Sequence, residues 1–200
     1  MNIDQQEVQK FADLAEKWWD TSGDFKPLHV INPLRAEYIS SKVELEGKTL
    51  LDVGCGDGVL MKHLKDIKNI DARGLEISKN NVQICISKGL PVIEGNAERD
   101  LQQFPDLSFD YVVLSQTLQA FYNPEKVIDD LLKVANKAIV TIPNFGYWKV
   151  RLHLFFKGTM PVTKHLPNEW YNTPNLHMCT IKDFVNLCKE KNISLFKSLA

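Results

Sequence analysis

The chain has 200 residues, 44% of them hydrophobic, and its 24 basic and 25 acidic side chains nearly cancel. This size suits one domain with a sizeable core. The charge balance excludes a global field favouring nucleic acid or an anionic membrane. No apolar run approaches the roughly 18 residues of a membrane span, and the N-terminus lacks a signal-peptide core. We therefore expect a cytoplasmic protein with reduced cysteines and no metal site, because the cysteines and histidines do not fall at zinc-ligand spacing.

Residues 1–44 precede the expected sheet and predict a helical cap. Apolar residues recur there at helical spacing, namely Val8, Phe11, Ala15, Trp18 and Trp19. Residues 31–35 then lead into a second helix, where Arg35 lies among apolar neighbours. Its guanidinium is suited to clamp a carboxylate through two hydrogen bonds, whereas a salt bridge with Glu37 is an equally good explanation.

Residues 49–58 form the most informative segment, TLLDVGCGDG, in which an apolar strand breaks into Gly54, Gly56 and Gly58. A predicted helix over 59–68 follows, and then a strand over 72–77 that contains Glu76 near its end. Strand, glycine-rich turn, helix, strand and acid is typical of a nucleoside-binding βαβ unit. The alternatives are glycines that serve only a tight turn and an acid that is merely solvated.

The spacing of this turn is G-x-G-x-G, with Asp52 before it, rather than the G-x-G-x-x-G of dinucleotide-binding proteins. Glu76 is expected to accept hydrogen bonds from ribose hydroxyls. The helix that starts near Asp57 is expected to present free N–H groups to a ligand carboxylate, and Asp52 to hold a ligand's ammonium group. The pattern therefore points away from NAD.

Strands and helices continue to alternate beyond this unit. Ser78 is a predicted N-cap and Gly89 a predicted helix stop. Further strands are expected over 91–94, 109–115, 138–142 and 193–196, and further helices over 124–135 and 183–191. This order predicts an α/β fold with a doubly wound, mostly parallel Rossmann-like sheet, which binds ligands beyond the carboxyl ends of its strands.

Polar side chains follow two of the later strands. Asn96 comes after the third strand, where its amide oxygen can accept a hydrogen bond from an adenine amino group. Ser115, Gln116 and Gln119 follow the buried fourth strand and are expected to face cofactor and substrate. An ordinary surface loop is the alternative. This cluster contains no carboxylate or histidine, which limits its chemistry.

Residues 143–180 form a long aromatic and proline-rich connection of a kind that is usually functional. Within it, residues 148–157 predict a helix with a basic face and an apolar face. Such a helix suits a membrane surface or a lid over an apolar substrate, but packing on the domain's own core or on a partner is favoured. Of the five histidines, His153, His165 and His177 are the better general-base candidates, against a surface role for each.

From about Leu45 onward the sequence resembles MetW, the methionine-biosynthesis family of class I S-adenosylmethionine (SAM) methyltransferase fold. The matching strings are LLDVGCGDGVLMKHL, RGLEIS, FPDLSFDYVVLSQTLQA, AIVTIPNFGYWKVRLHLFFKGTMPVTKHLP and WYNTPNLHMCTIKDF. The resemblance implies SAM as cofactor and an association with homoserine O-acyltransferase. The cofactor-binding residues expected are Arg35, Asp52, Gly54, Cys55, Gly56, Gly58, Glu76, Ile77, Asn96, Ala97 and Ser115.

Residues 1–42 instead resemble the N-terminus of UbiG, the ubiquinone-biosynthesis O-methyltransferases, through KFADLAEKWWDTSGDFKPLHVINPLRAEYI. In that family the arginine of the INPLR segment contributes to the SAM site, which supports the role of Arg35. The same family carries a Glu-His pair after strand four for metal-assisted methylation, where this chain has Gln119 and Ala120, and Gln116 replaces a Glu. That difference counts against metal-assisted activation of a phenol.

Three functions follow from these resemblances. The first is a MetW-like, SAM-binding protein of methionine biosynthesis that transfers methyl groups to a small acceptor. The second is an O-methyltransferase acting on a polyprenyl hydroxybenzene, with a lipid-like acceptor and peripheral membrane contact, which is not favoured. The third is a non-catalytic, SAM-responsive partner of homoserine O-acyltransferase. We also expect a SAM-binding domain over 45–200 whose sheet lacks the seventh strand of this fold and leaves an edge exposed.

Overall fold

The computed structural model describes residues 26–67, 69–163, 168–173 and 175–196. The expected N-terminal helix with Trp18 and Trp19, most of the UbiG-like segment and His165 lie outside these residues.

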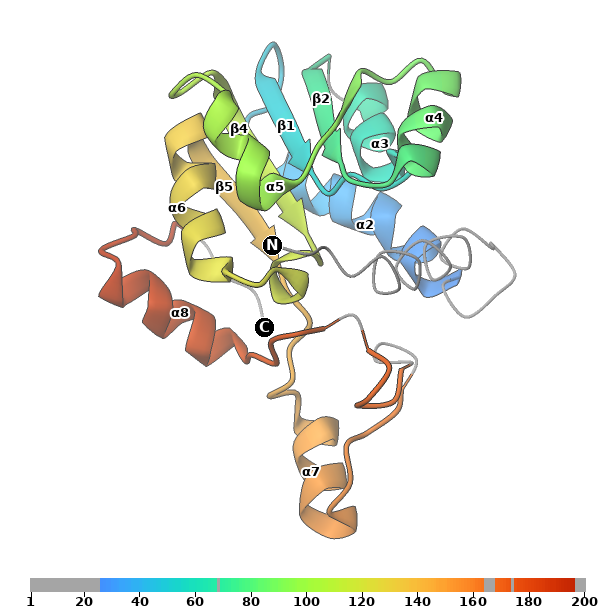
Figure 1. Cartoon of the computed structure of the whole chain (residues 1–200), viewed down its shortest axis with the longest axis vertical. Coiled ribbons are helices and arrows are strands. Elements are labelled where there is room, and N and C mark those ends of the chain that lie inside the picture. Colours follow the sequence, from blue (N-terminus) through green and yellow to red (C-terminus); the bar gives the residue numbers. More distant parts are fainter. Residues whose placement is uncertain (1–25, 68, 164–167, 174, 197–200) are drawn as a thin grey trace.

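The centre of the molecule is a sheet of five parallel strands (Figure 1). They are β1 (Thr49–Val53), β2 (Asp71–Glu76), β3 (Val92–Glu94), β4 (Phe109–Ser115) and β5 (Ala135–Thr141). Their order is β3-β2-β1-β4-β5, and every pairing is parallel. The chain therefore builds outward from β1 to β3 and then returns to place β4 on the other side of β1. In a doubly wound sheet the ligand crevice opens at this reversal, beyond the carboxyl ends of β1 and β4.

Helices cover both faces of the sheet (Figure 1). One face carries α2 (Lys26–Lys42), α3 (Val59–Ile67) and α4 (Lys79–Ser87). The other carries α5 (Ala97–Asp100), the 3-10 turn η1 (Leu101–Gln103), α6 (Pro124–Val134) and α8 (Ile181–Glu190). A second 3-10 turn, η2 (Leu118–Ala120), follows β4. Burial on both faces explains why the central strands β1 and β4 have runs of consecutive buried residues.

Side-chain alternation along the strands divides the interior into two cores. Leu50 and Val113 point to the α2–α3–α4 side, while Leu51 and Val112 point to the α5–α6 side. Because the strand period is two, one apolar run supplies both cores. Ala36 and Ile39 of α2 belong to the first core, so the described end of the expected cap packs as part of this domain.

Most element boundaries agree with the sequence. Ser78 caps α4 by accepting a hydrogen bond from the Asn81 N–H, and Gly89 follows that helix with φ of +70°. Thr180 and Asp183 form a reciprocal capping box at the start of α8. Three starts differ by more than one residue. β5 begins at Ala135, directly after α6, three residues earlier than expected. α8 begins at Ile181, two residues early, and α2 begins at Lys26, before the 31–35 segment that was expected to lead into it.

The strand expected over 193–196 is wrong. No residue of this segment pairs with the sheet, and in the described chain β5 is an edge strand. The backbone reason is local: Asn192 has φ of +56°, and the Ile193 N–H donates to the Cys188 carbonyl at 2.8 Å to close α8. Ile193 then packs against the core, and the segment lies near β5 without pairing with it, because the Lys137 Nζ of β5 is 6.0 Å from the centroid of the Phe196 ring.

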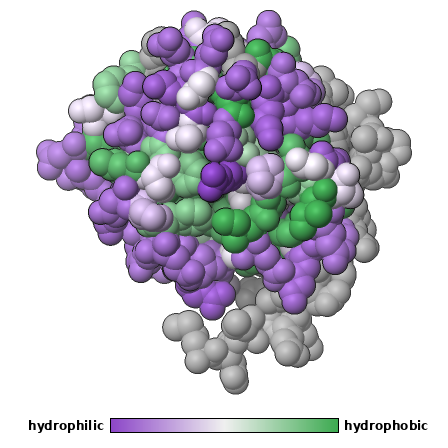
Figure 2. Space-filling model, turned by 90° about the horizontal axis from the view of Figure 1, so that it is seen from above, coloured by the Kyte–Doolittle hydropathy of each residue, from purple (hydrophilic) through white to green (hydrophobic). Residues whose placement is uncertain are grey.

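The helix expected over 148–157 forms as α7 (Trp148–Lys157), but it does not pack on the domain's core. Only Val150 is buried, and Figure 1 shows α7 standing apart from the sheet and its covering helices. Of the two kinds of packing that the sequence favours, packing on the domain's own core is not found among the described residues, and packing on a partner stays a prediction. Seen from above Figure 1, a different face shows a band of hydrophobic residues among mostly hydrophilic ones (Figure 2). Among the described helices, none is both long and apolar enough to cross a membrane.

Candidate functional site

The glycine turn after β1 is built from three residues in the left-handed region. Gly54, Gly56 and Gly58 have φ of +69°, +57° and +76°. A Cβ on Gly58 would lie 2.5 Å from Cδ1 of Leu90, and one on Gly54 would lie 3.0 Å from Cγ2 of Thr117. Backbone conformation therefore demands all three glycines, and packing against protein neighbours excludes a side chain at two of them. The turn by itself thus requires three glycines rather than one.

Glu76 at the end of β2 holds this turn in place. Its Oε2 accepts the Gly56 N–H at 2.8 Å, and its Oε1 accepts the Ser78 N–H at 2.9 Å. The side chain is buried, so the alternative of a solvated acid is excluded. Each carboxylate oxygen retains a lone pair that can accept from a hydroxyl group.

Asp52, on β1, is a buried carboxyl group with an unused acceptor. Its side chain is 1% exposed, and its Oδ2 has no hydrogen-bond partner. Burial raises the pKa of Asp52 to about 7, with a further increase from the nearby Glu76 charge and an opposing effect from Arg35. A buried acceptor without a donor is unfavourable, so this atom is suited to a cationic or N–H-bearing ligand.

Arg35 reaches the same region from α2. Its Nη1 donates to Oδ1 of Asn32 at 2.9 Å and to Oγ of Ser115 at 2.8 Å. The structure thus joins Arg35 to the end of β4 and records no salt bridge to Glu37 among the described residues. Burial lowers the pKa of the guanidinium, and the negative charge of Asp52 opposes that change.

Sequence reasoning gave no role to the pair Asp57 and Lys88, which secures the far end of the turn. The Asp57 Oδ1 accepts the Val59 N–H at 3.2 Å, and α3 starts at Val59, where the helix predicted over 59–68 also starts. The Lys88 Nζ donates to Asp57 Oδ2 at 2.7 Å and to the Asp57 carbonyl at 3.0 Å. An acid immediately before a helix is a capping signal that the sequence already contained.

Cys55, inside the turn, is buried against the second core thiol, Cys85. Cys85 Sγ lies 3.2 Å from the Gly56 carbonyl oxygen to which it donates. The hydrogen bond with Cys85, together with burial, raises the pKa of the Cys55 thiol. All four cysteines are free, and Cys55 serves packing of the turn in its neutral form.

The carboxyl ends of β4 and β5 bring further polar groups beside Arg35. Ser115 Oγ lies 3.2 Å from Thr141 Oγ1, and the Gln116 N–H donates to the Thr141 carbonyl at 2.9 Å. Gln116 itself has φ of +59°, an uncommon conformation for a residue other than glycine. Strain of this kind, about 1–3 kcal/mol, clusters at functional sites.

Gln119 is buried in η2, at 7% exposure, which excludes the alternative of an ordinary surface loop. Its Nε2 donates to the Gln116 carbonyl at 2.7 Å, but its Oε1 has no partner. The Gln119 carbonyl accepts the N–H groups of Leu176 and His177, at 2.9 and 3.0 Å. The structure therefore brings His177 beside Gln119 through its backbone, while the His177 side chain is exposed.

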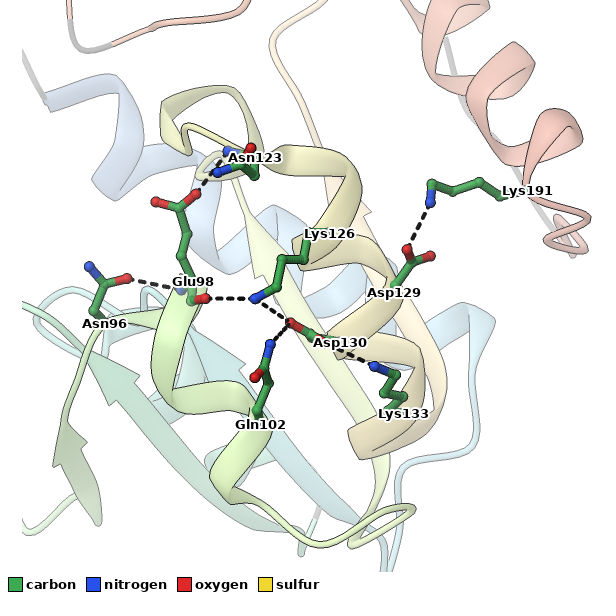
Figure 3. A network of polar contacts seen from close by, with 9 residues as sticks. All are labelled: Asn96, Glu98, Gln102, Asn123, Lys126, Asp129, Asp130, Lys133 and Lys191. Atoms are coloured by element: carbon green, nitrogen blue, oxygen red, sulfur yellow. Dashed lines mark hydrogen bonds and ion pairs between the residues drawn. The ribbon is translucent and has the colours of Figure 1, made fainter.

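Asn96 has a structural role that the sequence did not reveal. Its Oδ1 accepts the Glu98 N–H at 2.9 Å and caps α5 (Figure 3). Glu98 in turn accepts the Asn123 N–H at 2.8 Å, and its carbonyl accepts from Lys126 at 3.1 Å. Asn96 thus fixes the helix that covers this corner, and the adenine contact remains a prediction. Beside it, Ala97 is buried and Ile77 is exposed.

His153 is not brought to the glycine turn. It lies on α7, and its Nε2 is 3.3 Å from Oγ1 of Thr159 within the same connection. In the described part of the chain, no group of three or more His, Cys, Asp or Glu residues is placed to hold a metal ion.

A parallel sheet of this order, with a glycine turn after β1 and an acid ending β2, defines the class I SAM-dependent methyltransferase fold. Solved structures agree on the class. A SAM-dependent methyltransferase of Thermotoga maritima, described as a possible histamine N-methyltransferase, superimposes with a TM-score of 0.61. It covers 90% of this chain and 77% of its own at 20% identity, so it establishes the fold alone.

The chain belongs to the family of the methionine biosynthesis protein MetW, whose family model matches residues 35–200. The match starts inside α2, ten residues before the boundary expected from the sequence. One relative is the bifunctional methionine biosynthesis protein MetXA/MetW of Rhodopirellula baltica, 32% identical over 156 residues. The matched stretch is 74% of this chain and 25% of that protein.

The ubiquinone biosynthesis O-methyltransferase of Proteus mirabilis is 34% identical over 140 residues, 66% of this chain. That length exceeds the N-terminal segment that carried the resemblance in the sequence, so the likeness extends into the sheet. The match spans 56% of that enzyme, and this chain therefore corresponds to little more than half of such relatives.

Proposed function

We propose that this chain binds S-adenosylmethionine at the carboxyl ends of β1, β2 and β4, and acts in methionine biosynthesis by transferring the methyl group to a small acceptor. The observation on which the proposal depends is the buried, unpartnered Asp52 Oδ2 beside a turn of three left-handed glycines. Such an acceptor needs a donor, and the ammonium group of SAM is one.

The surrounding residues fit the rest of the cofactor. Arg35, with Nη1 on Ser115, offers its remaining N–H groups to a carboxylate. Glu76 has free lone pairs for two ribose hydroxyls. Exposed Ile77 and buried Ala97 would border the adenine, with Asn96 at its amino edge. The sulfonium of bound SAM supplies an electrophilic methyl group.

Chemistry at the end of β4 would depend on orientation. Ser115, Gln116 and Gln119 offer hydroxyl and amide groups, which position a substrate but do not take up a proton near neutral pH. This set favours an acceptor that is already nucleophilic, such as an amine, a thiolate or a carboxylate. Holding such an acceptor in line with the methyl group is an effect that can provide several kcal/mol of the barrier reduction.

Two further functions have specific support. The identity to ubiquinone enzymes supports O-methylation of a polyprenyl hydroxybenzene, against which stand Gln119 and Ala120 in place of a Glu-His pair. The fused MetXA/MetW relative supports a non-catalytic role as a SAM-responsive partner of homoserine O-acyltransferase, because one chain there unites the two named parts.

One series of measurements separates these functions. SAM is titrated into the full chain by calorimetry, with Asp52→Asn as the site variant and Asp66→Asn, an exposed acid near the end of α3, as the matched control. We expect binding by the wild type and the control, and weak binding by Asp52→Asn. Labelled methyl transfer is then assayed with polyprenyl hydroxybenzenes, and homoserine O-acyltransferase activity is measured with and without the chain.

The outcomes are distinct. Methylation of the hydroxybenzene would establish the ubiquinone-related function. A change in acyltransferase activity that depends on SAM without methyl loss would establish the regulatory one. Absence of SAM binding by the wild-type chain would refute the common basis of all three.

A further inference from the structure

Helix α7 exposes an apolar stripe that the described part of the domain does not cover. Trp148, Leu152 and Phe155 occupy positions i, i+4 and i+7, which lie on one side of a helix. Trp148 is 56% exposed and Phe155 is 81% exposed, and Phe156 extends the stripe with its ring 5.0 Å from that of Phe155. Val150, the buried residue, lies on the opposite side. The helix is therefore attached to the domain by one side and presents large apolar side chains on the other.

This exposure is unusual for a helix of ten residues. A helix this short is marginally stable in water on its own, and it gains its stability from packing. Contiguous exposed apolar side chains mark interaction sites more often than accidents of the surface. The same helix stands apart from the sheet (Figure 1), so its outer side is accessible to a large molecule.

The charge of the surrounding sequence indicates the chemistry of what binds there. Residues 131–168 contain no acidic residue, although the whole chain has 25 acidic and 24 basic ones. Of the basic residues in this stretch, Lys149, Arg151 and Lys157 lie on α7, whereas Lys133 pairs with Asp130 and Lys137 lies on β5. Lys149 lies over the Trp148 ring, 5.4 Å from its centroid, and so places a cation directly beside the stripe. Cations flanking an apolar stripe are complementary to an apolar groove with an acidic rim.

We propose that the α7 surface, defined as Trp148, Leu152, Phe155, Phe156 and the flanking Lys149, Arg151 and Lys157, docks into an acid-rimmed apolar groove of a protein partner. For the partner's identity the inference rests on the alternative given under the proposed function, in which the fused MetXA/MetW relative supports association with the homoserine O-acyltransferase. A hydrophobic groove of a protein typically binds an amphipathic helix through apolar side chains at positions such as i, i+4 and i+7.

Two other occupants fit the same observations less well. A second copy of this chain would bring two cationic surfaces together, which repel each other. An anionic bilayer attracts basic segments with about 1 kcal/mol for each Lys or Arg near its surface, and clusters of roughly 4–8 are typical. The α7 surface has fewer such residues, namely Lys149, Arg151 and Lys157, so lipid attraction alone is weak.

The test uses the purified full chain and the purified acyltransferase of the same organism. Binding is measured by calorimetry or interferometry for wild type, for Phe155→Ser and for the double variant Arg151→Glu with Lys157→Glu. Matched controls are Ile86→Ser, an exposed apolar residue on α4, and Lys62→Glu, an exposed cation on α3. SAM binding is measured for every protein, so that damage to the cofactor site is detected separately.

We expect the double charge reversal to weaken acyltransferase binding by at least about 10-fold, Phe155→Ser by roughly 10-fold, and the controls to remain within about 2-fold. SAM affinity should stay unchanged throughout. An acidic-to-Lys change on the partner's rim should restore binding to the double variant Arg151→Glu with Lys157→Glu.

Other results overturn the proposal. The first is equal acyltransferase binding by all variants, and the second is no acyltransferase binding by a wild type that still binds SAM. The third is that the α7 variants lose only self-association. The fourth is that they lose only binding to vesicles containing anionic lipid. Failure of SAM binding in the wild type would instead refute the proposed function, whatever the docking result.

Discussion

The glycine-turn half of the molecule and the 143–180 connection differ in how closely the rest of the chain holds their residues. In the first, Gly58, Glu76 and Asp57 are each fixed by hydrogen bonds or by close packing within the chain. In the second, α7 leaves Trp148 and Phe155 uncovered among the described residues. The comparison teaches that the proposed small-molecule site is built from residues bonded to one another, whereas the proposed docking surface lies on a helix that stands apart from the sheet.

The largest expected effect is at the glycine turn, where Gly58→Ala adds a Cβ 2.5 Å from Leu90 Cδ1 at φ of +76°. Left-handed strain of about 1–2 kcal/mol and overpacking of about 1–3 kcal/mol should lower the free energy of unfolding by about 2–5 kcal/mol. Urea denaturation measures this change. The control is Gly47→Ala, which has φ of +67° and no atom within 4 Å, and should lose only the strain. Equal losses would show that packing at Gly58 is unimportant.

Asp52→Asn should separate stability from binding. The folded pKa of Asp52 is raised to about 7, whereas an unfolded aspartate titrates near roughly 4. The folded state therefore binds the extra proton, and the contribution of Asp52 to stability is present near pH 4 and lost as the pH rises through about 7.

At pH 8 we expect the cofactor-free Asn variant to be more stable than wild type by about 1–3 kcal/mol, with a smaller difference at pH 5. Its SAM affinity should fall roughly 10- to 100-fold, because a charged hydrogen bond is lost. Denaturation at both pH values measures the change in stability, and calorimetry measures the change in SAM affinity. A wild type that is the more stable at pH 8 would show that Asp52 is ionised and well paired.

Ser115→Ala should have an intermediate effect. It removes the oxygen that accepts from Arg35 Nη1 at 2.8 Å and that lies 3.2 Å from Thr141 Oγ1. A net loss of about 0.5–1.5 kcal/mol in SAM binding is expected, because Arg35 is no longer held in place. Ser87→Ala is the control, since its exposed hydroxyl bonds only the Ile84 carbonyl of its own helix. Identical SAM affinity in both variants would exclude a positioning role for Ser115.

The smallest effect is expected on α7. Phe155→Ser should change the free energy of unfolding by no more than about 0.5 kcal/mol, since the ring is exposed. The same change at buried Phe109 of β4 should cost at least about 3 kcal/mol. Thermal denaturation of the two variants makes the comparison. A large loss for Phe155→Ser would mean that the α7 stripe packs within this chain.

The sequence predicted the sheet well because its signals are local. The apolar strands, Ser78 as a cap and the glycines of the turn each report the conformation of their own neighbourhood. It failed at 193–196, where apolar alternation resembles a strand, but the turn at Asn192 is followed by packing of Ile193 on the core and the segment does not pair with β5. It also missed the position of α7, because amphipathic spacing shows which side is apolar and not what covers it.

The site was predictable in its residues but not in their connections. Asp52 and Glu76 stood out by spacing, whereas the bond from Arg35 to Ser115 joins positions 80 residues apart. The Lys88 contact to Asp57 and the capping role of Asn96 likewise depend on how elements meet. Whether these residues bind the cofactor stays a prediction for calorimetry.

The Gln119 carbonyl accepts the N–H groups of both Leu176 and His177 and so connects the glycine-turn half to the 143–180 connection. One atom of the η2 turn after β4 thereby fixes the base of the connection that carries α7. If docking at α7 alters these hydrogen bonds, the affinity for a ligand near Gln119 must change, and by thermodynamic linkage that ligand changes docking by the same factor. Such a coupling would report the SAM level of the cell to whatever α7 binds, with no turnover required.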